Sequence, residues 1–355
     1  MIGTIKPSKG ALYVNSYQKI VETLAAGRAC TLETRLRGEA GEIGTGLVRE
    51  LTELTPERDP KGRLCARVTM ERAEDGSITV REPMLPQERL IVLGGGHIAL
   101  PVCQFGAACG FEVIVIDDRP DFANAARFPE AARVICDSFE NGIAALRITP
   151  FDYVVVITRG HRHDADCLRA LLPGVFPAYL GMIGSRRRTK GLLEMLADEG
   201  FDPALLGRIC TPIGLAIGAV TPAEIAVSIL SEVIAYRRLP EHGDPMRCCG
   251  DSDLELSTLQ YLAENREPKA IVTVIETKGS TPRGTGAKMA VSPLGQVTGS
   301  IGGGCSEGAV IRDAVRIIGT GRYKIIDIDL TGEVAESDGM VCGGTMKVLV
   351  EDATE

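Results

Sequence analysis

The hydrophobic positions in the middle of the chain fall in short runs separated by stretches of helical length. Runs that are apolar at nearly every position are typical of strands buried on both faces of a parallel sheet. Such runs occur at residues 90–93, 112–117, 132–135, 152–158 and 179–184. The first run ends in glycines, and residues 222–238 close the series with helical apolar spacing. We therefore predict an α/β fold with a Rossmann-type parallel sheet domain over residues 88–240.

After this region the hydrophobic pattern changes. A stretch rich in proline, glycine and charged residues predicts a linker at residues 241–255. A helix over 256–265, a strand over 270–276, a glycine-rich stretch and a closing strand over 346–350 follow. Together they predict a smaller α/β domain with glycine motifs at the C-terminus, residues 256–355.

The two ends of the chain resemble each other. In each, a helix leads into a strand, and a glycine-led segment ending in glutamate comes later. The matching segments are 20–24 with 259–262, 30–34 with 272–277, and 76–82 with 344–351. On this interpretation residues 11–86, within an N-terminal α/β segment at 1–87, are a degenerate copy of residues 257–352 without its glycine motifs. Short matches also arise by chance, so repeat and coincidence both stay open.

Length, composition and charge narrow the classes of function. A chain of 355 residues fits two or three domains. A net charge of −8 disfavours nucleic acid as a partner, because phosphate backbones need a basic face. The chain has no apolar run of about 18 residues and no signal-peptide pattern, so we expect no membrane association and a cytoplasmic location. The eleven cysteines contain no C-x-x-C pair, which disfavours a zinc site.

The first predicted strand ends in a glycine loop typical of nucleotide binding. Glycines there allow a tight turn and a close approach to a pyrophosphate, and the helix N-terminus that follows favours anions. Asp117 ends the second strand, where a carboxylate can bind ribose hydroxyls, although Arg119 weakens the preference for a free 2′-hydroxyl. A tight turn without a ligand is the plain alternative. The predicted contacts are Gly94, Gly96, His97, Ala99 and Asp117.

Polar residues follow the fourth and fifth predicted strands, at the edge where open sheets bind ligands. His161, His163 and Asp164 are compatible with a metal site, an acid–base pair, ligand contacts without metal, or a polar loop that caps the next helix. Ser185 is expected to be the N-cap of a helix that begins with Arg186, where a bound anion would relieve the unfavourable cation. We include both histidines, Ser185 and Arg186 among the predicted cofactor contacts.

Three glycine motifs supply candidate chemistry in the C-terminal domain. Ser280, Arg283 and Lys288 combine a hydroxyl and two cations with glycine-freed backbone N–H groups, which suits a phosphate cradle. A loop with Gly303 and Gly304 opens a helix, and a third motif lies just before the closing strand.

Two cysteines adjoin these motifs. Cys305 is expected near a helix N-terminus, where the dipole lowers a thiol pKa and favours the thiolate. A thiolate there is a nucleophile, a sulfur carrier or a soft-metal ligand. Cys342 is expected to face the same cleft. For both cysteines, a small residue in a tight turn is the plain alternative.

The ordered set of motifs resembles the xanthine dehydrogenase accessory factor family (XdhC/CoxI). The segments that carry the resemblance are 94–99, 115–124, 127–129, 161–164, 179–187 and 212–226 in the Rossmann-type half, and 279–283, 303–307 and 342–344 in the C-terminal domain. In the usual family arrangement the glycine-motif domain precedes the Rossmann domain, whereas here it follows. This departure favours a cleft formed between the two protomers of a homodimer.

The resemblance implies an accessory protein that binds molybdenum cofactor (molybdopterin), assists its sulfuration and inserts it into a xanthine dehydrogenase-type molybdenum hydroxylase. It implies a cofactor-maturation chaperone rather than a turnover enzyme. The implied partners are the hydroxylase apoenzyme and a sulfur donor such as a cysteine desulfurase. Cys305 would contact molybdenum or sulfur, with Glu307 to orient it and Cys342 nearby. The residues that would hold the cofactor are Ser280, Arg283, Lys288, Gly303 and Gly304.

Two other functions remain compatible with the residues. An NAD-dependent oxidoreductase would use the glycine loop and hold a small substrate near His161, but would leave the C-terminal motifs unexplained. A redox- or nucleotide-sensing module would use Cys305 and Cys342 as its sensor. The bound nucleotide could be NAD, a cytidine nucleotide or the nucleotide half of molybdenum cofactor.

Overall fold

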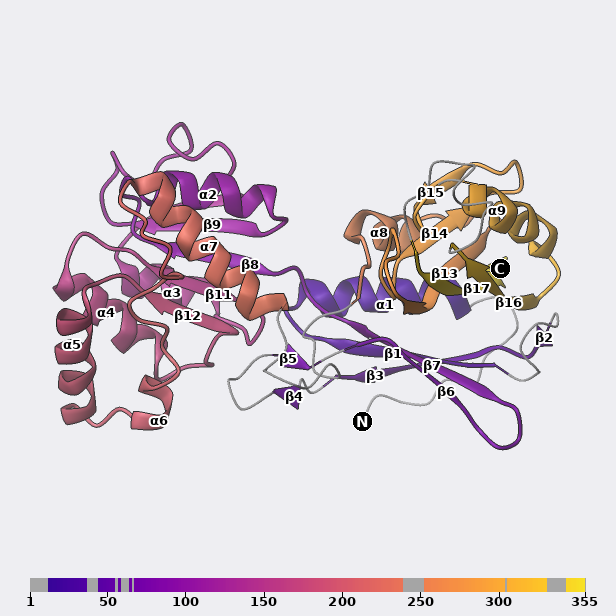
Figure 1. Cartoon of the computed structure of the whole chain (residues 1–355), viewed down its shortest axis with the longest axis horizontal. Helices are drawn as coiled ribbons and strands as arrows, with labels where there is room; N and C mark the ends of the chain where they lie inside the picture. The colour runs from indigo at the N-terminus through magenta and orange to yellow at the C-terminus, as the bar shows by residue number, and fades with distance from the viewer. Residues whose placement is uncertain are drawn as a thin grey trace. The chain divides into compact units, whose positions relative to one another are not determined.

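The computed structural model describes residues 12–36, 44–54, 57–58, 64–65, 67–238, 252–303, 305–330 and 343–354. They form two compact units, which are described separately (Figure 1). The Rossmann unit comprises residues 58–65 and 87–249, and the sandwich unit combines 1–57 and 66–86 with 250–355. The two ends of the chain thus belong to one unit. The part of the predicted linker up to residue 251 lies outside the described residues.

The Rossmann unit contains the predicted parallel sheet. Within residues 87–238, its strands lie in the order β10-β9-β8-β11-β12, and all neighbours are parallel. Their bounds are β8 (Arg89–Leu93), β9 (Glu112–Asp117), β10 (Arg133–Cys136), β11 (Tyr153–Val156) and β12 (Tyr179–Met182). Every residue of β11 and β12 is buried, as expected of strands covered on both faces. The predicted Rossmann-type fold is confirmed.

Helices cover both faces of this sheet (Figure 1). On one face lie α2 (Ala99–Ala108) and α7 (Pro222–Arg238). On the other lie α3 (Phe139–Leu146), α4 (His161–Leu171), α5 (Arg186–Asp198) and α6 (Pro203–Leu206). The start of α7 is a capping box: Glu224 N donates to the Thr221 hydroxyl, and the Glu224 carboxylate accepts from Thr221 N at 2.8 Å.

Two antiparallel sheets form the sandwich unit. In the described residues, one has the order β3-β1-β7-β6 and the other β15-β14-β13-β17-β16-β2. The N-terminal segment supplies β1 (Cys30–Leu36), β2 (Gly44–Thr45), β3 (Val48–Glu53), β6 (Thr69–Arg72) and β7 (Ile78–Met84). The C-terminal segment supplies β13 (Ala270–Lys278), β14 (Lys288–Val291), β15 (Val297–Gly299), β16 (Arg322–Asp329) and β17 (Thr345–Asp352). A separate short ladder joins β4 (Glu57–Arg58) to β5 (Leu64–Cys65).

The six-stranded sheet is covered on both faces. Helix α9 (Cys305–Ile317) packs Val310 and Ala314 on one face, in a core shared with Val272 and Val348. The other face shares its core with the four-stranded sheet and with α1 (Leu12–Ala25) and α8 (Leu256–Glu264), which contact each other. This double coverage explains why the first six residues of β13 are all buried.

Candidate functional site

The loop between β8 and α2 lies so close to neighbouring backbone that two of its positions have no room for a side chain. Gly94 has a φ of 113°, and a Cβ there would lie 2.5 Å from the carbonyl oxygen of Ile157. A Cβ on Gly95 would overlap the carbonyl oxygen of Phe122. At Gly96, by contrast, no described atom lies within 4 Å of the Cβ position. The first two glycines therefore determine the turn, and the third leaves open space before α2.

The start of α2 suits an anion. Ile98 at the N-cap makes no side-chain cap bond, so backbone N–H groups dominate this end of the helix. His97 is exposed, whereas Ala99 is fully buried in the core. Of these two predicted contacts, Ala99 can act through its backbone alone.

Asp117 holds this loop against the end of β9. Its Oδ2 accepts from Gly95 N at 2.8 Å and from Arg119 Nη2 at 2.9 Å, and its Oδ1 accepts from Arg119 N at 3.0 Å and Nε at 2.8 Å. Burial raises the pKa of Asp117, but these bonds lower it by more, so the pKa lies below its usual value. A ribose could reach this carboxylate only by displacing one of these donors. The ribose contact stays a prediction.

Two guanidinium groups flank the loop. Arg119 lies 3.7 Å from the centroid of the Phe122 ring, and Arg127 lies 5.1 Å from it. Arg127 Nε also donates to the carbonyl of Gly95 at 3.1 Å. Sequence reasoning did not assign Arg127 to the site, because its link to the loop depends on folding of residues 118–128.

The loop lies where the order of the strands reverses. The chain proceeds from β8 to β9 and β10 on one side and from β11 to β12 on the other, and such a switch point is where open α/β sheets bind ligands. Gly160, after β11, has no described atom within 4 Å of its Cβ position. Beside it, Arg159 forms a two-bond ion pair with Asp118, with 2.8 Å between Nη2 and Oδ2. This partner lowers the pKa of Asp118 to about 2.

The two histidines after β11 point towards different helices. Arg188 of α5 donates to Nε2 of His161, and both line a groove of about 460 Å³ between α4 and α5. The ring of His163 packs against Phe139 of α3, with 5.8 Å between centroids. Among the described residues, no group of three or more His, Cys, Asp or Glu side chains could hold a metal ion. The geometry thus gives no support to the metal interpretation.

The remaining predicted residues at this edge have simpler surroundings. Asp164 is buried, which raises its pKa, and accepts a bond from the Thr158 hydroxyl at 2.6 Å. It therefore ties the first turn of α4 to the loop after β11. Helix α4 has Gly160 as its N-cap and no side-chain cap bond, so the interpretation that Asp164 caps this helix is wrong. Ser185 occupies the N-cap of α5 without a side-chain cap bond, and Arg186 is exposed.

In the sandwich unit the three glycine motifs lie together. We call residues 279–283, 299–303 and 343–344 the glycine cluster. A Cβ on Gly344 would lie 2.6 Å from the carbonyl oxygen of Ser280. A Cβ on Gly302 would overlap Pro282. The first motif thus contacts both of the others, through positions that only glycine can occupy.

Helix α9 begins at this cluster. Glu307, in its first turn, accepts bonds from Ile301 N and from the Ser300 hydroxyl, both at 3.1 Å, and so joins the helix to the loop before it. Cys305 is the first residue of α9, and the structure describes its backbone alone. Gly304 and Cys342 lie outside the described residues. The chemistry of both cysteines stays a prediction.

The two cations predicted to cradle phosphate have other partners. Arg283 donates from Nε to Asp253 at 2.7 Å and from Nη1 to Glu255 at 2.6 Å. Lys288 is fully buried, and its Nζ donates to Glu82 at 2.6 Å and to the Thr273 hydroxyl at 2.9 Å. The prediction that Lys288 binds an anionic cofactor needs correction, because Lys288 is the first residue of β14 and points towards the four-stranded sheet. Ser280 remains exposed.

A cavity of about 280 Å³ adjoins the glycine cluster at the ends of β13, β16 and β17. Lys347 is 3.2 Å from Glu276, and Lys278 is 3.3 Å from the same carboxylate. Sequence reasoning missed this cavity, although its charged residues alternate along the strands. Its lining residues are Glu276, Lys278, Asp327, Ile328, Asp329, Thr345, Met346 and Lys347.

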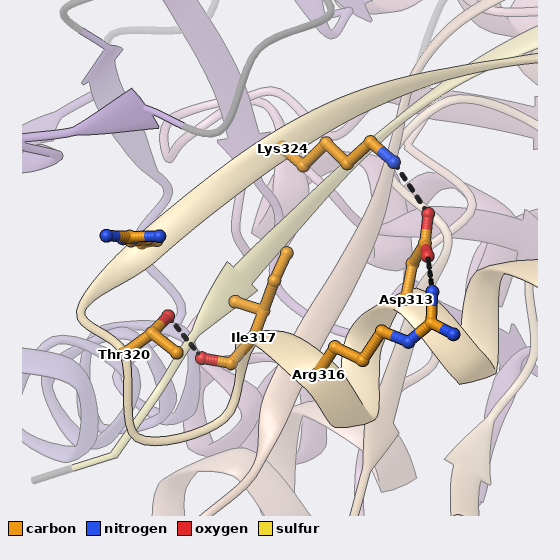
Figure 2. A pocket seen from close by; sticks show the side chains of 6 residues that line it. Asp313, Arg316, Ile317, Thr320 and Lys324 are labelled. Atoms are coloured by element: carbon orange, nitrogen blue, oxygen red, sulfur yellow. Dashed lines mark hydrogen bonds and ion pairs between the residues drawn. The ribbon is translucent and has the colours of Figure 1, made fainter.

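A smaller hollow of about 180 Å³ lies at the far end of α9 (Figure 2). Lys324 and Arg316 both face Asp313 there, at 2.7 Å and 3.6 Å, and the Thr320 hydroxyl donates to the carbonyl of Ile317. Cations near a helix C-terminus complement the helix dipole. The charged residues of this hollow are therefore explained by their role in stabilising the end of α9.

The fold and its sites thus define a two-unit α/β protein with a Rossmann-type ligand edge and a separate glycine cluster at a helix N-terminus. The model of the XdhC Rossmann domain matches residues 90–233, and that of the XdhC and CoxI family matches residues 262–329. The chain therefore belongs to the XdhC and CoxI family, with the Rossmann domain first. This confirms the resemblance found in the sequence.

Two curated relatives and one solved structure are similar to parts of this chain. A Bacillus subtilis protein named as a probable xanthine dehydrogenase subunit is 36% identical over 153 residues, which are 43% of this chain and 44% of the relative. An uncharacterized protein, YqeB, from Escherichia coli is 33% identical over 150 residues, 42% of this chain and 27% of the relative. The matches therefore span less than half of either curated relative. A crystal structure titled as a xanthine dehydrogenase from Bacillus halodurans is 24% identical, with a TM-score of 0.47, over 63% of this chain and 67% of that chain.

Across the described ranges, no helix has the length and apolarity needed to cross a membrane.

From the geometry of the glycine loop we expect substitutions at two neighbouring positions to differ in their effect on stability. Gly95→Ala should lower the free energy of unfolding by about 1 to 3 kcal/mol, the usual cost of overpacking, because its Cβ meets the carbonyl of Phe122. Gly96→Ala should unfold like the wild type and instead weaken nucleotide binding. Chemical denaturation and calorimetric titration with nucleotides check both. Equal stabilities of the two variants would contradict the assigned geometry.

The Arg159–Asp118 pair predicts a pH dependence. Because the pKa of Asp118 falls to about 2 in the folded protein, below the ordinary value of about 3.9, its stabilising contribution is complete above pH 4 and is lost as the pH falls towards 2. NMR titration of the carboxyl group should show this low midpoint. Arg159→Gln should return it towards the ordinary value, whereas Arg162→Gln should leave it in place. An ordinary midpoint in the wild type would refute the pairing.

Proposed function

We propose that the chain is an accessory protein for the maturation of a xanthine dehydrogenase-type molybdenum hydroxylase, and that it binds molybdenum cofactor, assists its sulfuration and delivers it to the apoenzyme. Membership in the XdhC and CoxI family and the name of the Bacillus subtilis relative support the general role. The residues of the glycine cluster support the finer steps of the proposal.

The observation that carries the proposal is that three glycine motifs contact one another and that one of them leads into α9. Glycines that touch neighbouring backbone bring these loops together, and Glu307 ties the loop at residues 299–303 to the helix. A cysteine at the start of a thirteen-residue helix lies where the dipole favours a thiolate. This position supports our assignment of Cys305 as the residue that contacts molybdenum or the sulfur being transferred.

The surroundings of the cluster fit a bulky anionic cargo through backbone groups. A Cβ on Gly343 would have no described atom within 4 Å, and one on Gly303 would meet only a Glu307 oxygen, at 3.9 Å. Open space beside glycines lets backbone N–H groups approach a pterin phosphate. Because Arg283 and Lys288 already pair with carboxylates, we assign the binding to the loops and Ser280. When bound, the cofactor would supply a molybdenum centre able to accept sulfur.

The Rossmann unit supports a nucleotide site as the second part of this function. Open space at Gly96 and Gly160, in the loops that follow the two strands at the switch point, can admit a nucleotide. An NAD-dependent oxidoreductase remains the rival. The four bonds that Asp117 accepts from Arg119 and Gly95 weigh against the NAD ribose, which would need the same carboxylate. The identity of the nucleotide, the sulfur donor and the homodimer are parts of the proposal.

The proposal predicts that Cys305 is required for activation of the client. In a reaction that contains a hydroxylase apoenzyme, molybdenum cofactor and a cysteine desulfurase, the wild-type chain should raise hydroxylase activity well above the reaction without it. Cys305→Ala should remove this increase while it leaves the folded state unchanged, because the side chain is replaced by a smaller one.

The matched control is Cys109→Ala, at the C-terminal end of α2 in the Rossmann unit, where the thiol is exposed. This variant should activate the hydroxylase as the wild type does. Equal activation by Cys305→Ala and Cys109→Ala would remove Cys305 from the mechanism. No activation by the wild type would overturn the accessory function.

A further inference from the structure

The N-terminal and C-terminal parts of the sandwich unit have the same topology. In chain order the first contains α1, β1, β3, β6 and β7, and the second contains α8, β13, β14, β16 and β17. Their sheet orders are β3-β1-β7-β6 and β14-β13-β17-β16, and every pairing is antiparallel. We call these two sets of elements the N-copy and the C-copy. The C-copy additionally carries β15 and α9.

The register of the strands matches as well. In the N-copy, Leu32 lies opposite Glu82 and Thr34 lies opposite Arg49. In the C-copy, Ile271 lies opposite Glu351 and Thr273 lies opposite Lys288. In each copy, one residue of the first strand lies opposite a carboxylate on the last strand. The residue two positions further along the first strand lies opposite a cation on the second strand.

These charges pair between the copies. Arg49 of the N-copy bonds to Glu351 of the C-copy, and Lys288 of the C-copy bonds to Glu82 of the N-copy at 2.6 Å. All four side chains are at most 3% exposed. When residue i of one half contacts residue j of the other and the reverse also holds, the interface has the pattern of a two-fold axis.

Apolar residues surround the paired charges in the same reciprocal way. Ile20 and Leu24 of α1 share a core with Leu259 and Leu262 of α8. Within this buried interface a charge left without its partner is strongly destabilising, so the two pairs favour one partner and one register. Burial lowers the pKa of Lys288, but the Glu82 carboxylate raises it by more, so the lysine stays protonated.

We infer that the N-copy acts as an intramolecular partner of the C-copy. It covers the face of the glycine-motif domain that a second copy of the same fold would otherwise occupy. One chain therefore builds a complete pseudo-symmetric sandwich with a single glycine cluster. The homodimer expected from the sequence would have to use another surface. This inference concerns assembly and does not depend on the proposed function.

Cleavage of the full chain tests this inference. A protease site inserted between Pro86 and Gln87, one of the points where the chain passes between the two units, allows the folded protein to be cut without removing any part of it. After cleavage, residues 1–86 should stay bound, and light scattering after size exclusion should give the mass of the intact chain. Release of the N-terminal fragment from the wild type would overturn the inference.

Charge reversal distinguishes specific pairing of the two copies from nonspecific association of the cleaved fragments. Lys288→Glu places a third carboxylate beside Glu82 and Glu351, so the cleaved protein should lose its N-terminal fragment, or the intact variant should fail to fold. The double variant Glu82→Lys, Lys288→Glu should retain the fragment. The control is Lys324→Glu on β16 of the same sheet, which breaks the more exposed pair with Asp313 of α9 and should also retain the fragment.

The two-fold pattern adds a second requirement. Arg49→Glu should release the fragment as Lys288→Glu does, and Arg49→Glu with Glu351→Arg should restore retention. Should reversal at one pair release the fragment and reversal at the other leave it bound, the copies are not equivalent. Retention by both single reversals would likewise contradict the assigned role of the charges.

Discussion

Both candidate sites of this protein depend on close contacts between backbone segments. These contacts occur at positions that admit only glycine. Gly94 and Gly95 bring the loop after β8 against its neighbours, and Gly302 and Gly344 do the same for the glycine cluster. At each place the close contact leaves open space beside a further glycine and directs the N-terminus of a long helix towards it. Where side chains are absent, backbone N–H groups become the main binding groups, which suits anionic ligands such as phosphates. One constraint thus shapes two sites in separate units.

Several buried and half-buried cations of the chain pair with its own carboxylates. Lys288 and Arg49 pair across the sandwich, Arg283 is held by Asp253 and Glu255, and Arg119 is bound to Asp117. These pairs position loops and sheets, and for this reason our proposal assigns ligand contacts to backbone groups and exposed residues. A family domain paired with a degenerate copy of itself can then present its glycine cluster once per chain.

Much of the fold follows from the sequence because its signals are local. Five apolar runs and one glycine loop suffice to predict the Rossmann sheet, since each strand and turn is encoded within a few residues. Lys288 illustrates the limit: beside glycines and a threonine it resembles a phosphate ligand, and its true partner, Glu82, lies 206 residues away in the chain. His161 and His163 are close in sequence but point to different helices, α5 and α3. Side-chain direction and distant pairing are set by tertiary packing, which no local pattern reveals.

Binding of molybdenum cofactor by this chain is the step on which the proposed function depends. It is tested most directly by purifying the full chain without oxygen, incubating it with the cofactor, and identifying the pterin and nucleotide that remain bound after gel filtration. We expect a retained pterin, reduced in Cys305→Ala and unchanged in Cys109→Ala. A wild-type chain that retains no pterin and binds NAD tightly instead would contradict the proposed function.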